Sequence, residues 1–516
     1  MSRAASEEVY NLVRSMTKAE KRYFKNYAGM GTTGKQVGYI KLFDKIGSQK
    51  KYNEAKILRG FSKINPFQFA NQKKYLAELI LESLRWYHSR HSVDAQLWAT
   101  LTEMEVLYEK RLLKQCLKVL HKAKAKAIQY DKQRHLLELL TWEERLAVET
   151  LSTDRSEKRI DEIFKENLVT AESVKNVIVL RELQNATNRF FRKGGLVRNK
   201  EDIAELNKIV THPLIRNEKK LTTYHELNHY FNIKGMYFML LSDWKNSYVW
   251  RKKHIDLIES HPEQLKEETR LYVSALNSFI LCCEYTNKNE ELEIAFEKVK
   301  QMLLIPACAN NSGILLRLLG CCSSVMHNYI QHGEFEKGME LLKNIESSFI
   351  KVLPEINRSS EISFYYTFSY ITFGAENYKR SLYWLNKILN ATDTGMRDDI
   401  RVSALLLNLI LHYELGNESQ LEYYVRSTYR FLYKRHRLFK IETIMLDLIR
   451  KKLPKTGSQK ELMDVFTRLK QEIEKLAKDP QQKRSLEYFD FISWLESKIS
   501  KRKFAEVVRA KGIIKE

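Results

Sequence analysis

One pattern recurs in two neighbouring stretches of the chain and restricts the fold more than any other feature. A turn residue is followed two positions later by an aromatic residue, three positions later by a small residue, and then by two apolar residues at helical spacing. The matching residues are Gly333, Phe335, Gly338, Leu342 and Ile345 in one stretch, and Glu376, Tyr378, Ser381, Leu385 and Ile388 in the other. Apolar residues at this spacing after a turn predict repeated pairs of packed helices.

The same spacing of turns extends along much of the chain. Candidate turn residues recur every 40 to 48 positions, at Lys110, Ser152, Gly194, Ser242, Asn287, Gly333, Glu376 and Gly416. Proline supports this register because it cannot continue a helix and therefore collects just past helix ends. Four prolines lie 19 to 21 residues after successive turns, at Pro213, Pro262, Pro306 and Pro354. Proline and glycine are scarce and no alternating strand pattern appears, so we predict an all-α protein.

The repeated pattern resembles the second helix of a tetratricopeptide (TPR)-like repeat. Together with the segments Met16–Phe24 and Tyr488–Leu495, the array resembles a family of uncharacterised bacterial TPR-like proteins. The resemblance implies a TPR-like α-solenoid, a right-handed superhelix of about eight helical hairpins with helical caps at both ends, and no assigned activity. We expect a basic helical capping module at 1–92, the repeat array at 93–436, and a basic helical cap and tail at 437–516.

The concave face of such an array is the predicted binding site. Stacked hairpins bury one face of each helix and leave a long groove. Aromatic residues at i, i+4 and i+7 of one helix fall where TPR family members line that groove, although core packing explains each of them equally well. The predicted groove residues are Asn232, Asn277, His327, Tyr366, Tyr370 and Phe373. Because aromatic anchors dominate many interfaces, we predict a non-enzymatic protein–protein interaction scaffold that holds a peptide or helix of another protein.

The formal charge of +23 is concentrated at the two ends of the chain. Residues 1–92 hold 18 Lys and Arg against 7 Asp and Glu, residues 426–516 hold 24 against 12, and the middle is neutral. Basic ends suit nucleic acid, anionic lipid or an acidic protein, and they also serve simply as solvated helix faces. Nucleic-acid binding through these ends is the alternative function, and it predicts an affinity that falls steeply with salt.

The sharpest catalytic motif is His225-Glu226-Leu227-Asn228-His229, an H-E-x-x-H sequence. Two histidines four positions apart share a helix face and are able to bind zinc, with the glutamate as general base. No third ligand is obvious, and the repeat register places both histidines on a polar face. We therefore predict that the motif is incidental and that the protein is not an enzyme and uses no metal or cofactor. A zinc hydrolase using His225, Glu226 and His229 is the less favoured alternative.

Three further features bear on cofactors and location. The segment Gly29–Gln36 nearly matches a phosphate-binding loop, but Gln36 replaces the Ser or Thr that holds magnesium, and no buried strand precedes it. Six cysteines lie in apolar helical runs without disulfide or metal-binding spacing, which predicts reduced core thiols. The chain shows no signal peptide, and its most apolar stretch, Val402–Leu411, is about half the length that spans a bilayer. We expect a cytoplasmic protein without membrane insertion.

Overall fold

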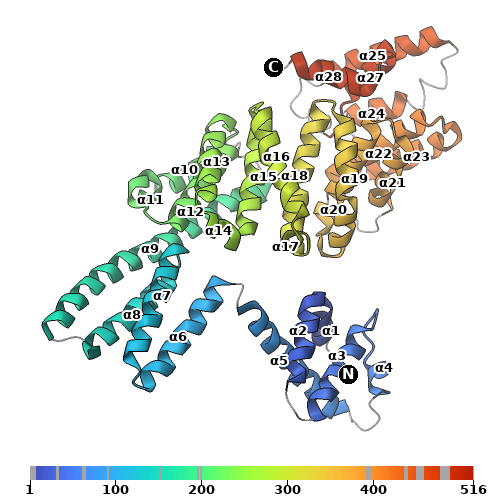
Figure 1. Ribbon diagram of the computed structural model, residues 1–516. Helices are drawn as coiled ribbons and strands as arrows, with labels where there is room; N and C mark the ends of the chain where they lie inside the picture. Colours follow the sequence, from blue (N-terminus) through green and yellow to red (C-terminus); the bar gives the residue numbers. More distant parts are fainter. Residues whose placement is uncertain are drawn as a thin grey trace. The chain divides into compact units, whose positions relative to one another are not determined.

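The structure is a computed structural model of the 516-residue chain. It describes residues 7–30, 34–60, 66–89, 92–150, 153–194, 197, 200–390, 397–434, 440–448, 458–476 and 488–514. Every regular element among these residues is helical, which confirms the all-α prediction (Figure 1). The chain forms two compact units, one of Met1–Arg181 with Asn217–Leu227, and one of Glu182–Arg216 with Asn228–Glu516. The predicted three-part division at residues 92 and 436 stays a prediction.

The first unit contains two hydrophobic cores made by consecutive helices. The first core uses α1 (Glu8–Ser15), α2 (Lys18–Gly29), α3 (Gly34–Gly47), α4 (Glu54–Leu58) and α5 (Pro66–Ser89). The second uses α6 (Val93–Glu109), α7 (Leu113–Gln129) and α8 (Gln133–Thr150), and η1 (Glu218–Lys220) also belongs to this unit. The turn predicted at Lys110 is confirmed, with the left-handed residue one position later at Arg111, whereas the turn at Asp131 was not predicted.

One long helix, α9 (Thr153–Gly194), replaces part of the expected repeat. Two successive hairpins turning at Ser152 and Gly194 would need a break between these residues, and α9 is continuous there. The reason is visible in the sequence, because neither proline nor glycine occurs between Thr153 and Lys193 and no residue forces the helix to end. Ser152 itself lies outside the described residues.

Five consecutive hairpins between Tyr224 and Lys434, which belong to the second unit from Asn228 onward, turn where the sequence predicts. The left-handed residue of each turn is the expected one, at Ser242, Asn287, Gly333, Glu376 and Gly416. The hairpins are α12 (Tyr224–Leu240) with α13 (Trp244–Glu259), α15 (Thr269–Tyr285) with α16 (Asn289–Leu304), α18 (Ser312–Gln331) with α19 (Phe335–Val352), α20 (Arg358–Gly374) with α21 (Tyr378–Leu389), and α22 (Asp398–Glu414) with α23 (Glu418–Lys434). The spacing rule therefore holds over this part of the chain.

Short elements separate the hairpins, and proline lies at the start of each of them or one residue later. They are α11 (Pro213–Arg216), which follows α10 (Lys200–Val210), then α14 (Pro262–Glu267), α17 (Pro306–Ala309) and η2 (Leu353–Glu355). Proline suits the first helical turn because its φ is already helical and its missing N–H would have no partner there. The predicted role of the four prolines is confirmed.

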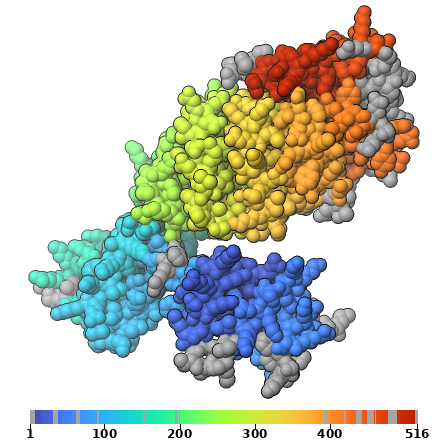
Figure 2. Space-filling model, turned by 45° about the vertical axis from the view of Figure 1, so that its right-hand side comes forward, coloured from blue at the N-terminus to red at the C-terminus, as the bar shows by residue number. Residues whose placement is uncertain are grey.

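One hydrophobic core runs through the hairpins and the end of the chain. Helix α15 packs against α13 and α18, and α18 packs against α20. The last elements are α24 (Lys440–Asp447), α25 (Gln459–Leu476), α27 (Phe491–Ser500) and α28 (Phe504–Ile514). Helix α25 packs on α27, and α28 contacts α18, so the C-terminal helices lie along one side of the later hairpins (Figures 1 and 2). None of the described helices combines the length and apolar character that a bilayer-crossing helix needs.

Candidate functional site

The aromatic residues predicted to line a groove are covered by the end of the same chain. Tyr366, Tyr370 and Phe373 lie on α20 and are only 6%, 8% and 1% exposed. The Tyr366 hydroxyl donates a hydrogen bond to the main-chain oxygen of Tyr488, at 3.0 Å. The main-chain N–H of Asp490 donates to the Tyr370 hydroxyl, also at 3.0 Å. Both tyrosines are thus tied to the segment that leads into α27.

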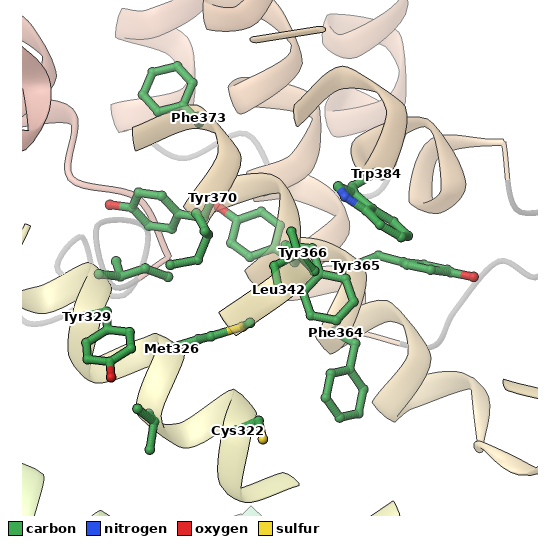
Figure 3. Close-up of a cluster of buried hydrophobic side chains, with 14 of the residues drawn as sticks. Cys322, Met326, Tyr329, Leu342, Phe364, Tyr365, Tyr366, Tyr370, Phe373 and Trp384 are labelled. Carbon is green, nitrogen blue, oxygen red and sulfur yellow. The ribbon is translucent and has the colours of Figure 1, made fainter. Parts of the chain in front are cut away.

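Rings from the C-terminal segment complete this cover. Phe489 and Phe504 pack against Phe373 with ring centroids 5.2 and 5.5 Å apart, and Phe489 also packs against Tyr370 at 5.2 Å. Figure 3 shows Tyr366, Tyr370 and Phe373 among the buried side chains of α18 and α20. The expectation of an open groove at these three residues is corrected: in the free chain they pack in the core, which was the alternative explanation.

A turn glycine lets the C-terminal segment approach closely. A Cβ atom on Gly333 would lie 2.6 Å from the main-chain oxygen of Ala505 and 2.8 Å from the main-chain nitrogen of Arg509. Gly333 also has a left-handed backbone, with φ of 68°, so two independent constraints select glycine here. The guanidinium of Arg509 donates a hydrogen bond to the Gly333 oxygen at 3.1 Å. The cover is therefore fixed by main-chain contacts as well as by packed rings.

Two other predicted groove residues, Asn277 and His327, lie on a polar face that stays accessible. Asn277 Oδ1 accepts a hydrogen bond from Ser324 Oγ at 3.0 Å, and His327 Nδ1 lies 2.8 Å from Glu284 Oε1. The His327 side chain is 51% exposed. We define the polar face by the side chains that link α15 to α18, namely Ser274, Asn277, Glu284, Arg317, Ser324 and His327. These pairs leave hydrogen-bonding groups at the surface over several helical turns.

Glu284 changes the titration of His327. Burial by itself lowers the pKa of the imidazole, but the hydrogen bond and negative charge of Glu284 outweigh it, so the pKa of His327 is raised. The second carboxylate oxygen of Glu284 is buried and has no hydrogen-bond partner among the described residues. The buried carboxylate therefore depends on the protonated His327 for compensation of its charge.

Asn232, the remaining predicted groove residue, is engaged by a buried arginine. Asn232 Oδ1 accepts a hydrogen bond from Arg251 Nη1 at 2.9 Å, and Arg251 is 2% exposed. Within the described residues, Nε and Nη2 of Arg251 have no hydrogen-bond partner, and burial lowers the pKa of this guanidinium. A Cβ atom on Gly235 would lie 2.7 Å from Arg251 Nε, so glycine at this position leaves room for the arginine side chain. Asn232 is needed inside the hairpin as the partner of a costly buried cation.

Glu226 of the H-E-x-x-H motif caps the N-terminus of α12. Its Oε2 accepts hydrogen bonds from the main-chain N–H groups of Thr222 and Thr223, both at 2.9 Å, and Thr223 Oγ1 accepts from the Glu226 N–H at 3.4 Å. This reciprocal arrangement is a capping box. Oε1 accepts from Asn176 Nδ2 at 2.9 Å, and Glu226 is 1% exposed. The carboxylate is therefore occupied by structural hydrogen bonds.

The two histidines of the motif contact different partners. His225 Nδ1 lies 2.7 Å from Asp131 Oδ2, and His229 Nδ1 lies 2.5 Å from Gln184 Oε1. A search of the described residues finds no group of three His, Cys, Asp or Glu side chains placed to hold a metal ion. The hydrogen bonds of Glu226, His225 and His229 give each residue a structural role.

The cysteines and the glycine-rich segment fall outside this site. All six cysteines are free and buried, as predicted, and burial raises the pKa of the Cys283 and Cys322 thiols to about 12. In the segment Gly29–Gln36, residues 31–33 lie outside the described part of the chain, and Gly34 begins α3.

Comparisons with protein-family models, with curated proteins and with solved structures gave no match. The resemblance to bacterial TPR-like proteins therefore stays a prediction from the repeat pattern.

Proposed function

We propose that the protein is a non-enzymatic, cytoplasmic interaction scaffold of the TPR-like solenoid type, a right-handed superhelix that binds a segment of another protein. Five consecutive hairpins with left-handed turns at the expected positions support the solenoid. The partner lies on the polar face of α15 and α18. The observation that carries the proposal is that Asn277 and His327, two of the predicted groove residues, stay accessible while the aromatic residues of the groove are covered.

The chemistry of the polar face suits a polar or acidic segment. Arg317 is exposed and donates through Nε to Ser274 Oγ at 3.2 Å and through Nη1 to the Gly313 main-chain oxygen at 2.7 Å, which holds the guanidinium in place and leaves Nη2 for a partner. His327 gains a positive charge at a higher pH than an ordinary histidine, because its pKa is raised. Hydrogen bonds to charged groups are the stronger ones, so a carboxylate of the partner would bind the guanidinium of Arg317, while the charge of His327 is compensated by Glu284.

The aromatic residues of α20 show that the hairpins can hold a polypeptide segment. Residues 488–508 of the chain itself lie against α20 through Phe489 and Phe504. A helical segment thus already fits against one part of the hairpin stack. A partner on the polar face would bind beside this segment and would not need to displace it.

Site-specific photocrosslinking tests the proposal. A benzophenone amino acid replaces His327 in the full chain, and the control places it at Ile350, which is 58% exposed on α19. We expect a discrete crosslinked protein from the first position and none from the second. The variant Arg317→Ala should reduce recovery of that protein about tenfold, whereas Lys343→Ala, an exposed control, should not. Equal crosslinking at both positions, or none at His327, would contradict the proposal.

A further inference from the structure

Helix α23 exposes tyrosine and arginine side chains opposite its buried residues and along one flank. The buried side consists of Leu421, Val425, Thr428 and Leu432. The exposed residues, named here the α23 stripe, are Tyr423, Arg426, Ser427, Tyr429, Arg430 and Tyr433. The three tyrosines are 70%, 43% and 65% exposed. Clustered aromatic side chains at the surface mark an interaction site more often than isolated ones do.

The stripe has a defined shape. Tyr423, Arg426 and Arg430 border a shallow hollow of about 310 Å³, together with Glu422 and Ser427. Farther along the helix, the rings of Tyr429 and Tyr433 stack, with centroids 6.0 Å apart and planes 13° from parallel. The stripe therefore offers flat aromatic faces at two places, with arginine side chains between them.

The charge of the stripe is positive. Arg426 forms an ion pair with Glu422 on the preceding turn, whereas Arg430 forms no ion pair with any described residue. The two arginines are one helical turn apart, so both guanidinium groups point to the same side. The stripe also lies at the start of the basic section 426–516, which holds 24 Lys and Arg against 12 Asp and Glu.

We propose that the α23 stripe binds single-stranded nucleic acid. Bases stack on Tyr423 and on the Tyr429–Tyr433 pair, and phosphates pair with Arg426 and Arg430. Every base has an aromatic face, so stacking of this kind tolerates many sequences, and a basic path between the rings follows the backbone. This goes beyond the proposed scaffold function because it uses another surface and another class of partner.

Other partners fit the stripe less well. A lipid surface selects helices whose exposed side is apolar enough to enter the bilayer, whereas this stripe exposes hydroxyl-bearing rings and guanidinium groups. An acidic peptide would pair with the arginines but would leave the exposed rings without stacking partners. Duplex nucleic acid keeps its bases inside the helix, where the tyrosines cannot reach their faces.

Fluorescence anisotropy tests this proposal. The full chain is titrated at low salt into labelled oligouridine of about 15 nucleotides, which is near the upper end of known site sizes. Tyr423→Ala/Tyr433→Ala should weaken binding about tenfold or more, and Tyr423→Phe/Tyr433→Phe, which keeps the rings, should not. Arg426→Gln/Arg430→Gln should weaken binding and reduce the slope of log affinity against log salt by about 1.4. Lys245→Gln/Lys343→Gln removes the same charge from other exposed positions of the unit and should change affinity less than about twofold.

Several outcomes would overturn the proposal. One is that the wild type does not bind the oligonucleotide at low salt. A second is that Lys245→Gln/Lys343→Gln lowers the affinity as much as the stripe variants do. A third is that the protein binds a duplex as tightly as the single strand. Binding to phosphatidylserine vesicles that the stripe variants abolish, without oligonucleotide binding, would assign the surface to membranes instead. The same titration with oligodeoxythymidine shows whether the protein prefers ribose or deoxyribose. Tighter binding of either single strand than of the duplex supports the proposal. The circular dichroism spectrum of each variant checks that it is folded.

Discussion

The hydroxyl of Tyr366 donates a 3.0 Å hydrogen bond to the main-chain oxygen of Tyr488, which lies 122 positions later in the sequence. This bond joins a hairpin helix to the C-terminal segment within a single core. The side of α20 that carries Tyr366 and Tyr370 is therefore covered by the chain itself. The accessible part of the predicted site is therefore limited to the polar face on α15 and α18.

The rings of the C-terminal segment should contribute strongly to stability. Phe489 is 1% exposed and packs against Tyr370, Phe373 and Phe504. We expect Phe489→Ala to lower the free energy of unfolding of the second unit by about 3–5 kcal/mol, because it removes a buried ring and leaves a cavity. Urea titration followed by hydrogen exchange of α20 peptides measures this change. Ile350→Ala, at an exposed position, should stay within about 0.5 kcal/mol of the wild type, and equal effects would contradict the burial of Phe489.

Asn232 and Arg251 should depend on each other. Asn232→Ala leaves a buried guanidinium without its one hydrogen bond to a described residue, so we expect a loss of about 1–3 kcal/mol in the free energy of unfolding. Arg251→Met should be nearly neutral or stabilising, since it removes the buried charge altogether. In the Arg251→Met background, Asn232→Ala should cost little. A double-mutant cycle by urea denaturation measures the coupling, and additive losses would contradict the account.

The pair His327 and Glu284 should make stability depend on pH. The pKa of His327 is raised in the folded chain above the unfolded value of about 6.5, so the folded state holds the proton more tightly. The contribution of the pair is fully present below about pH 6.5 and is lost as the pH rises through the folded pKa. The melting temperature of the wild type should therefore fall relative to that of His327→Gln between about pH 6 and 9. A constant difference across this range would show that the pair does not titrate.

The capping box at Glu226 should matter for folding and not for metal binding. Glu226→Ala removes the acceptor of the Thr222 and Thr223 main-chain N–H groups and of the Asn176 side chain, so we expect a loss of about 1–2 kcal/mol in the free energy of unfolding. Protein purified without chelator should contain zinc well below one equivalent, and His225→Ala should not change that content. Stoichiometric zinc that disappears in His225→Ala would restore the hydrolase alternative.

Several turn positions were predictable because glycine and proline have strong backbone preferences of their own. Gly333 and Gly416 adopt left-handed φ without a Cβ penalty, and Pro262 and Pro306 mark helix starts. A capping box likewise starts α2, where Thr17 and Glu20 stand in a T-x-x-E sequence. The same T-x-x-E signature occurs from Thr223 to Glu226. Glu226 belongs to both the T-x-x-E and the H-E-x-x-H sequences, so the sequence alone does not distinguish a helix cap from a metal site there.

The cover on the aromatic residues could not be predicted in the same way. Helical periodicity shows that Tyr366, Tyr370 and Phe373 share one side of a helix, but a core and a groove give the same pattern. What distinguishes them is the segment that lies against that side, and here it is about 120 residues away in the sequence. No local signal in α20 identifies this segment.

Hydroxyl-radical footprinting of the free protein tests most directly that the chain itself covers the aromatic residues of α20 that were predicted to line a groove. The measurement reports side-chain oxidation residue by residue, and it compares tyrosines of like chemistry. We predict that Tyr366 and Tyr370, 6% and 8% exposed, react far more slowly than Tyr423 and Tyr433, 70% and 65% exposed. Oxidation of Tyr366 and Tyr370 at the rate of Tyr423 would show an open groove and contradict this account.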